Sequence, residues 1–303
     1  MEEISHIKSL NSKRKQYKKD KSLIYFLIPA ILFINIVMVI PILYSLGISF
    51  SKWVFLVQGS GGQFAGLSNY VEVLKDINFW KSVKTTFLFS SAAVSFELLI
   101  GILIAVFLNK NFFGRGVFRA LIVIPMVIAP AVIGQFWSLL YAQNGVFNFF
   151  LVSLGLARIN WLDLKTAIWS MIIVDVWQWV PFVVIIILAG LQSVDSSTVE
   201  AARVDGADNN RIFWYIELPI LVPFIIVVLF FRLTDALKEF DKIFIMTQGG
   251  PGSATRVLSI YNYEAGFHVM QLAKSSSISW FFSILIIIIL LPILIVMFKR
   301  MQT

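Results

Sequence analysis

Ionisable side chains interrupt two of the most apolar stretches of this chain. Asp175 lies in one stretch, and Arg232, Asp235, Lys238 and Glu239 lie near the end of the other. Charged groups within membrane-spanning segments usually face the interior of a helix bundle or a water-filled cavity. Arg232, Asp235 and Glu239 recur at helical spacing and therefore share one face. These residue types fit hydrogen bonding to a polar solute; a purely structural Arg232–Asp235 pair is the alternative.

The chain offers little for catalysis. It contains no cysteine, which excludes disulfides, thiolate metal sites and cysteine nucleophiles. Its two histidines, His6 and His268, lie in the basic arm and in an outer loop, outside the apolar segments. A polytopic membrane enzyme, such as a lipid-modifying hydrolase or transferase, is therefore a weak alternative. We expect no catalytic residues and no metal site.

Composition places the chain in a membrane. Of its 303 residues, 58% are hydrophobic and only 14% are charged, whereas a soluble domain has about 25% charged residues. We predict an all-α polytopic protein, because six segments reach the roughly 20 residues that span a bilayer. They are about Leu23–Leu46, Thr85–Leu108, Ala120–Tyr141, Ala167–Leu191, Pro219–Phe240 and Ser277–Phe298. Pro125 and Pro130 lie within the third segment, where proline kinks a helix or marks its end.

The distribution of Lys and Arg predicts the orientation. With the N-terminus inside, the inner segments hold 14 of these residues and the longer outer loops hold 9. Seven of the 14 lie in a basic arm, residues 1–22, which we read as a topology signal that contacts membrane lipid. The net charge of +8 therefore does not indicate a nucleic-acid partner. The remainder, residues 23–303, forms one six-span domain with both termini in the cytoplasm.

A polar island, about residues 192–218, separates the fourth and fifth segments on the cytoplasmic side. Ser197 and Glu200 fit a capping box, so we expect a short helix that starts near Ser197 and ends at Gly206. A second helix is expected to start around Asp208-Asn209-Asn210. A helix as short as the one between Ser197 and Gly206 is marginal on its own in water, so it needs a partner surface. The spacing that characterises the island involves Glu200, Ala201, Ala202, Asp205, Gly206, Ile216, Leu218 and Pro219.

This spacing resembles the EAA signature of the membrane-spanning subunits of bacterial binding-protein-dependent ABC importers. Further stretches resemble the maltose-type and glycerol-phosphate-type branch, which imports carbohydrates. They are Gly66-Leu67-Ser68-Asn69-Tyr70, Gly114-Arg115-Gly116-x-Phe118-Arg119, Asn160-Trp161-Leu162 and Thr247-x-Gly249-Gly250-Pro251. The resemblance covers nearly the whole chain from Leu23 onward.

The resemblance implies a type I ABC importer permease fold in a bacterial cell membrane. It also implies three kinds of partner: a second EAA-containing permease subunit, two cytosolic ABC ATPase subunits and an extracytoplasmic solute-binding protein. This chain would bind no cofactor, and ATP and Mg would bind to the ATPase subunits. The implied function is to translocate a sugar or oligosaccharide delivered by the binding protein. An importer for an amino acid, polyamine or phosphate ester remains the alternative.

The resemblance further places the solute between the fourth and fifth segments. The positions that line the solute path in the family are carried over to this sequence and combined with the intramembrane charges. The expected lining then comprises Asp175, Trp177, Gln178, Trp179, Phe182, Arg232, Asp235, Ala236 and Glu239. Trp177 and Trp179 are expected to stack on sugar rings, or else to belong to an interfacial belt. The charges of the fifth segment depart from the small or amide residues of the maltose-type pattern, so the ligand's charge stays open. Glu97 is expected to form an interhelical hydrogen bond.

Overall fold

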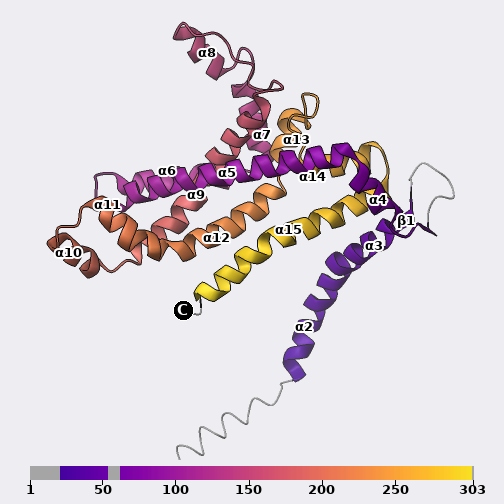
Figure 1. The fold of residues 1–303 in the computed structure, drawn as a ribbon, viewed down its shortest axis with the longest axis horizontal. Helices are drawn as coiled ribbons and strands as arrows, with labels where there is room; N and C mark the ends of the chain where they lie inside the picture. Colours follow the sequence, from indigo (N-terminus) through magenta and orange to yellow (C-terminus); the bar gives the residue numbers. More distant parts are fainter. Residues whose placement is uncertain (1–20, 54–61, 302–303) are drawn as a thin grey trace, which may run out of the picture.

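The computed structural model describes residues 21–53 and 62–301, so most of the predicted basic arm lies outside the described residues. Four long helices lie side by side, α5 (Ile77–Asn109), α9 (Ala167–Gln192), α12 (Leu218–Leu237) and α15 (Leu272–Met301) (Figure 1). The two short strands, Ser51–Lys52 (β1) and Gln63–Phe64 (β2), pair antiparallel, with Ser51 opposite Phe64. The other elements are α2 (Lys21–Ile34), α3 (Ile40–Ser49), α4 (Ser68–Lys75), α6 (Arg115–Val127), α7 (Pro130–Leu140), α8 (Val146–Ser153), α10 (Ser196–Val204), α11 (Asn209–Ile212), α13 (Asp241–Thr247), α14 (Leu258–Tyr263) and the π-helical segments η1 (Asn35–Val39), η2 (Phe213–Glu217) and η3 (Glu264–His268).

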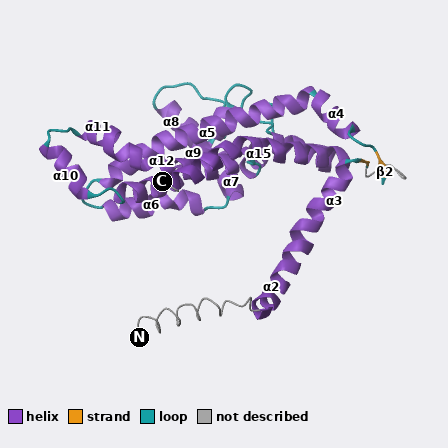
Figure 2. Ribbon diagram, turned by 60° about the horizontal axis from the view of Figure 1, so that its bottom comes forward, coloured by secondary structure: helices purple, strands orange, loops and turns teal. Residues whose placement is uncertain are grey.

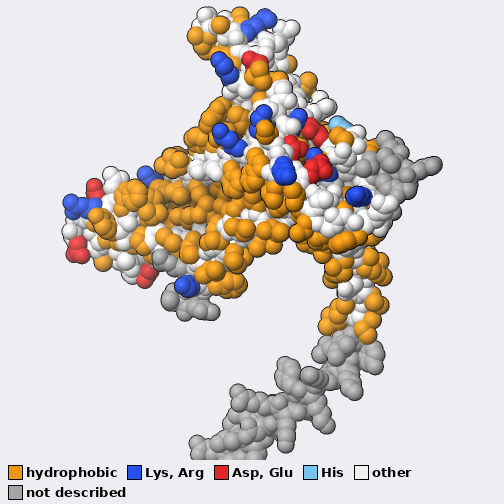
Figure 3. All heavy atoms as spheres, turned by 45° about the vertical axis from the view of Figure 1, so that its right-hand side comes forward, with side chains coloured by type: hydrophobic (Ala, Val, Ile, Leu, Met, Phe, Trp, Pro, Cys, Tyr) orange, Lys and Arg blue, Asp and Glu red, His pale blue; other side chains and the backbone are white. Residues whose placement is uncertain are grey.

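Five helical stretches of the described residues are long and apolar enough to cross a membrane. The described structure reaches the predicted six if a bent pair of helices counts as one span. The predicted all-α membrane architecture is therefore confirmed. In Figure 3 a broad hydrophobic surface separates the charged side chains around α10 from those at the opposite end of the bundle.

The third predicted segment, Ala120–Tyr141, is not one straight helix. It is divided between α6 and α7, which meet at an angle of 98°. Ile128 and Ala129 between them are extended, because Pro130 disfavours helical backbone in the residue before it. The expected effect of the prolines is thus confirmed: the predicted segment is a bent pair of helices.

Close packing of α5 against α9 holds the centre of the bundle. Gly101 lies so near Val183 that a Cβ at this position would be 2.5 Å from Cγ1 of that valine. Gly190 of α9 approaches Leu221 and Phe224 of α12 in the same way. Small residues at such crossings let membrane helices approach each other closely, so α5, α9 and α12 pack tightly together in this conformation.

The first span, α2, η1 and α3, leaves this bundle (Figure 2). No residue in its most apolar stretch is buried. Only its outer end is fixed, where Nδ2 of Asn69 donates to the carbonyls of Ser49 and Ser51 at 2.8 and 2.9 Å. The hydroxyl of Tyr70 also lies 2.7 Å from that of Ser49. The Asn69-Tyr70 stretch thus anchors the first span to the rest of the chain.

A polar cluster ties the outer ends of three helices together. Asp76, which begins α5, accepts hydrogen bonds from the hydroxyl of Tyr261 at 2.5 Å and from Nζ of Lys274 at 3.2 Å. Partial burial opposes ionisation of Asp76. The hydrogen bonds from Tyr261, the Asn78 amide and Lys274 outweigh that effect and hold the pKa of Asp76 below its ordinary value.

Candidate functional site

The polar island folds as predicted, apart from the residue that caps it. Helix α10 begins at Ser196, and the carboxylate of Asp195 accepts a hydrogen bond from the Ser197 amide at 3.0 Å. Asp195 therefore caps the helix in place of the predicted Ser197. These contacts with Ser197 lower the pKa of Asp195. Asp195, two positions before Ser197, takes this role because its carboxylate reaches the free amides of the first turn of the helix.

The end of α10 is fixed by Gly206. Its φ of +84° is left-handed, the Gly206 amide donates to the carbonyl of Arg203 at 3.0 Å, and the Ala207 amide donates to Ala202 at 2.9 Å. This pair of bonds is a Schellman motif, which terminates a helix through a residue that is usually glycine. The predicted termination at Gly206 is confirmed.

Helix α10 has no buried residue. Glu200 and Ala201 are exposed, Ala202 is half-buried, and Val204 is 88% exposed. Nearby, on η2, Tyr215 is 80% exposed. A helix of nine residues with so much free apolar surface is marginal on its own, so the geometry suits a docking surface for another protein.

The island continues into α12 without a flexible linker. Asp208 caps α11 by accepting from the Arg211 amide at 2.9 Å, as predicted for this stretch. Segment η2 follows directly and leads into α12, with Ile216 and Leu218 half-buried at the junction and Pro219 exposed in the first turn of α12. A displacement of α10 can therefore be transmitted along the chain to α12.

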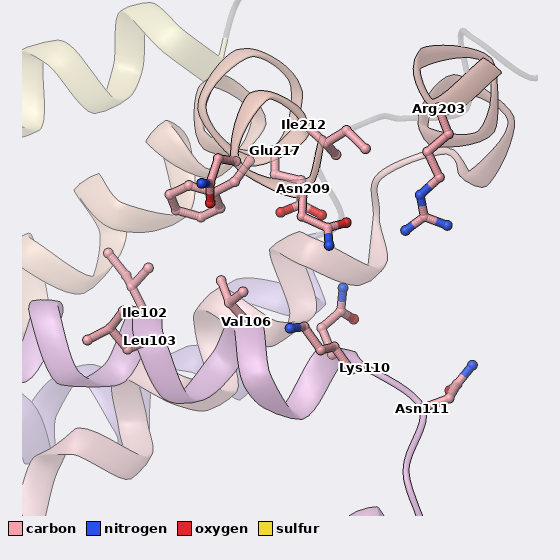
Figure 4. A pocket seen from close by; sticks show the side chains of 12 residues that line it. Ile102, Leu103, Val106, Lys110, Asn111, Arg203, Asn209, Ile212 and Glu217 are labelled. Atoms are coloured by element: carbon pink, nitrogen blue, oxygen red, sulfur yellow. The ribbon is translucent and has the colours of Figure 1, made fainter. Parts of the chain in front are cut away.

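A pocket of about 540 Å³ lies between this island and the cytoplasmic end of α5 (Figure 4). Lys110 and Asn111 line one side, and Arg203, Asn209 and Glu217 line the other. The space separates the α10–α11 region from the rigid α5–α9 pair. It leaves room for the island to move relative to the bundle.

Five ionisable side chains form one buried network, which we call the charged cluster: Glu97, Asp175, Arg232, Glu239 and Lys242. Arg232 donates from Nε and Nη2 to the two oxygens of Glu97, at 2.6 and 2.9 Å, and from Nη2 to Asp175 at 3.0 Å. Lys242 Nζ lies 2.6 Å from Asp175 and 2.8 Å from Glu239. The cluster thus joins α5, α9, α12 and α13, and it confirms the interhelical role expected of Glu97.

Lys242 is one of the nine basic residues that the predicted topology assigns to the outer loops, but it lies in the bundle instead. The short helix α13 follows α12 after a short break and packs against α7 and α9, and the Lys242 side chain is 2% exposed. Lys242 follows Glu239 by three residues and precedes an apolar run, Ile243-Phe244-Ile245-Met246. That helical spacing is the one signal in the sequence that links Lys242 to Glu239.

Four of the nine residues of the predicted solute lining are buried by contacts within the chain. Asp175, Gln178, Arg232 and Ala236 are each no more than 2% exposed. Gln178 donates to the carbonyl of Ile128 at 3.2 Å, at the break between α6 and α7, and accepts from Lys242 at 2.9 Å. In this conformation these side chains face one another, because a buried charge is stable only when it is paired.

Trp177 and Trp179 lie on different sides of α9, since residues two apart on a helix point in nearly opposite directions. Trp177 packs edge-on to Trp137, with ring centroids 5.5 Å apart. Trp179 instead lies against Arg232, whose guanidinium carbon is 4.5 Å from its ring centroid. The two rings therefore face different surroundings in this conformation, and stacking of both on a sugar stays a prediction.

Trp179 is part of a partly exposed surface on α9 and α12, which we call the aromatic face and define as Trp179, Phe182, Phe231 and Asp235. Phe182 contacts Trp179 and Phe231 edge-on, with centroids 6.4 Å apart in both pairs. Phe231 and Asp235 are both 52% exposed and lie one helical turn apart on α12. Sequence reasoning missed Phe231, because a phenylalanine in an apolar span carries no distinguishing signal.

Residues 97–300 match the family described as the binding-protein-dependent transport system inner membrane component. A probable ABC transporter permease, y4oQ of Sinorhizobium fredii, is 45% identical over 93% of this chain and 92% of its own length. The trehalose/maltose transport system permease MalF of Thermococcus litoralis is 37% identical over 84% of this chain and 87% of its own. The multiple sugar-binding transport system permease MsmF of Streptococcus mutans is 33% identical over 90% and 93%.

The fold also matches a chain in the crystal structure of a bacterial alginate ABC transporter in complex with an alginate pentasaccharide-bound periplasmic protein. The TM-score is 0.80, with 23% identity over 92% of this chain and 94% of that one. This likeness supports the type I permease fold. Together with the family match over two thirds of the sequence, it shows that the chain belongs to the inner membrane components of binding-protein-dependent transport systems.

Proposed function

We propose that this chain is one permease subunit of an ATP-driven importer for a sugar or oligosaccharide. The observation that carries the proposal is the exposed α10 helix, which Gly206 terminates and which α11 and η2 connect to α12. The solute class is supported by relatives more than 30% identical whose names specify trehalose/maltose and multiple-sugar transport. Its partners in this proposal are a second permease subunit, two cytosolic ATPase subunits that bind ATP and Mg, and an extracytoplasmic binding protein.

In this mechanism, α10 docks on an ATPase subunit through the flat side around Ala201 and Ala202. Closure of the ATPase pair then moves α10, with Glu200 and Asp205 on its surface, relative to the bundle. Segment η2 and the junction at Leu218 transmit the motion to α12. The aromatic face of α9 and α12 alternately opens to the two sides of the membrane.

We assign solute contact to the aromatic face. The exposed ring of Phe231 and the half-buried ring of Trp179 stack on the apolar faces of a sugar, and the Asp235 carboxylate accepts hydrogen bonds from its hydroxyl groups. The charged cluster lies behind this face and positions Trp179 through Arg232. Phe231→Ala is expected to raise the sugar concentration needed for half-maximal transport, while Phe298→Ala, at a similarly exposed ring on α15, is expected to leave it unchanged.

Two glycines allow a controlled test of coupling. Gly206 and Gly155 both have left-handed backbones, with φ of +84° and +74°, and a Cβ added at either would meet no neighbouring side chain within 4 Å. Alanine at either site costs about 1–2 kcal/mol of backbone strain, but only Gly206 ends α10. In the reconstituted complex, Gly206→Ala is expected to reduce sugar-stimulated ATP hydrolysis strongly, and Gly155→Ala is expected to preserve it. Equal activities of the two variants would contradict the coupling role.

A further inference from the structure

An apolar groove of about 920 Å³ runs between α5, α6 and α9, on a side of the molecule away from the charged cluster. Ile100, Ile104 and Leu108 of α5 form one wall, Ile122 of α6 another, and Val176 of α9 the floor. The 98° turn from α6 into α7 leaves this space unfilled. No ionisable residue lines it.

The groove is long enough to hold a lipid acyl chain. On α5 it extends from Phe96 to Leu108, which corresponds to roughly 18 Å at 1.5 Å per residue. One leaflet contributes roughly 15 Å of hydrocarbon thickness. A chain in the groove exchanges contacts with neighbouring lipid chains for contacts with these side chains, so van der Waals packing along its length holds it there.

Two arginines stand at the cytoplasmic end of the groove. Nη2 of Arg119 donates to the carbonyl of Leu108 at 3.0 Å, and the Leu108 side chain lines the groove. Nε of Arg119 is buried without a hydrogen-bond partner in the described part of the chain. Arg115, one turn earlier, donates only to the side-chain oxygen of Asn111 at 2.8 Å. These groups have unused capacity to bind an anion.

The surrounding sequence supplies no carboxylate to neutralise them. No Asp or Glu occurs between Glu97 and Asp163, and within residues 21–53 and 62–301 neither arginine forms an ion pair. Helix α6 begins at Arg115 without a side-chain cap, so its first amides also favour negative charge. In the predicted topology Arg115 and Arg119 lie on the cytoplasmic side, where the leaflet carries anionic lipids.

We propose that this groove binds one anionic glycerophospholipid of the cytoplasmic leaflet. One acyl chain lies along α5, and the phosphate contacts Arg115, Arg119 and the first amides of α6. The lipid would fill the space left by the bend and connect α5 to α6 beside the cytoplasmic pocket. The site is separate from the aromatic face and does not depend on the solute.

Native mass spectrometry of the intact, delipidated transporter tests the proposal, with phosphatidylglycerol and phosphatidylcholine as probes. The wild type is expected to retain one phosphatidylglycerol in preference to phosphatidylcholine. Because each basic residue near a membrane surface contributes about 1 kcal/mol, R115Q/R119Q is expected to weaken phosphatidylglycerol binding roughly 10- to 30-fold. The matched control R158Q/K165Q removes two cations from the outer side, where Arg158 likewise donates to an asparagine, and is expected to retain it.

Two further variants separate binding from folding. R115K/R119K keeps the charge and is expected to retain most of the phosphatidylglycerol affinity, even though the Arg119 contact with Leu108 is lost. I104W fills the groove and is expected to reduce binding of both lipids while leaving the arginines in place. Equal retention of the two lipids by the wild type, or unchanged phosphatidylglycerol binding in both R115Q/R119Q and I104W, would overturn the proposal. The latter result would favour a partner subunit as the occupant of the groove.

Discussion

Replacing Asp175 by asparagine tests whether the charged cluster stabilises the bundle through its central carboxylate. Asp175 accepts from Arg232 at 3.0 Å and from Lys242 at 2.6 Å, and it is fully buried. Asparagine has nearly the same shape, but it can satisfy only one of these cations and turns an N–H₂ group toward the other. A hydrogen bond to a charged group contributes about 1.5–3 kcal/mol, and breaking a buried pair costs about 3–5 kcal/mol. Since each cation keeps one further carboxylate, we expect a loss of about 3 kcal/mol, at the lower end of that range.

The assay is thermal or denaturant unfolding of the purified complex. Asp163→Asn is the control, because it makes the same change at an exposed carboxylate just before α9. Adding Lys242→Met to Asp175→Asn removes a buried cation that has lost one of its two carboxylates, so the double variant is expected to recover part of the stability. A change of less than about 0.5 kcal/mol for Asp175→Asn, as is usual at surface sites, would refute the reasoning.

Two more predictions concern packing and pH. Gly101→Leu is expected to prevent assembly or to lower the stability of the complex by more than about 1–3 kcal/mol, because the leucine side chain would overlap Val183. Gly47→Leu is the control, since no atom lies near the Cβ position of Gly47. Equal yields of folded complex for the two variants would contradict the prediction. Because the folded pKa of Asp76 is lowered, its contribution to stability is complete above its unfolded pKa and is lost as pH falls below about 4. Tyr261→Phe should reduce this acid sensitivity in unfolding measurements across pH, and an unchanged profile would exclude the cluster as its cause.

Hydropathy and capping chemistry made much of the fold predictable. Spans such as Ala167–Leu191 are set by local sequence, and the structure places the corresponding helix at Ala167–Gln192. The left-handed end at Gly206 and the cap at Asp208 depend only on neighbouring residues, so the cytoplasmic island was also predictable. The bend after α6 was indicated by Pro130, although its 98° angle depends on packing against other helices.

The arrangement of the charges was not predictable from the sequence. Arg232 pairs with Glu97 and Asp175 across 135 and 57 residues, so the pairing is decided by how α5, α9 and α12 pack. Sequence spacing suggested Asp235 as the partner, yet its carboxylate lies 3.9 Å from Arg232 and is half-exposed. Lys242 belongs to the cluster because α13 packs against α7 and α9, and its spacing from Glu239 alone does not reveal that packing.

The most direct test is transport by the reconstituted importer in vesicles. This chain, a second permease, the ATPase subunits and a binding protein would be combined, and uptake of neutral, acidic and basic oligosaccharides and of an amino acid would be measured with and without ATP. The account predicts ATP-dependent uptake of one oligosaccharide class, which is lost in Gly206→Ala and retained in Gly155→Ala. Uptake of the amino acid with no oligosaccharide transported, or uptake that is independent of ATP, would contradict it.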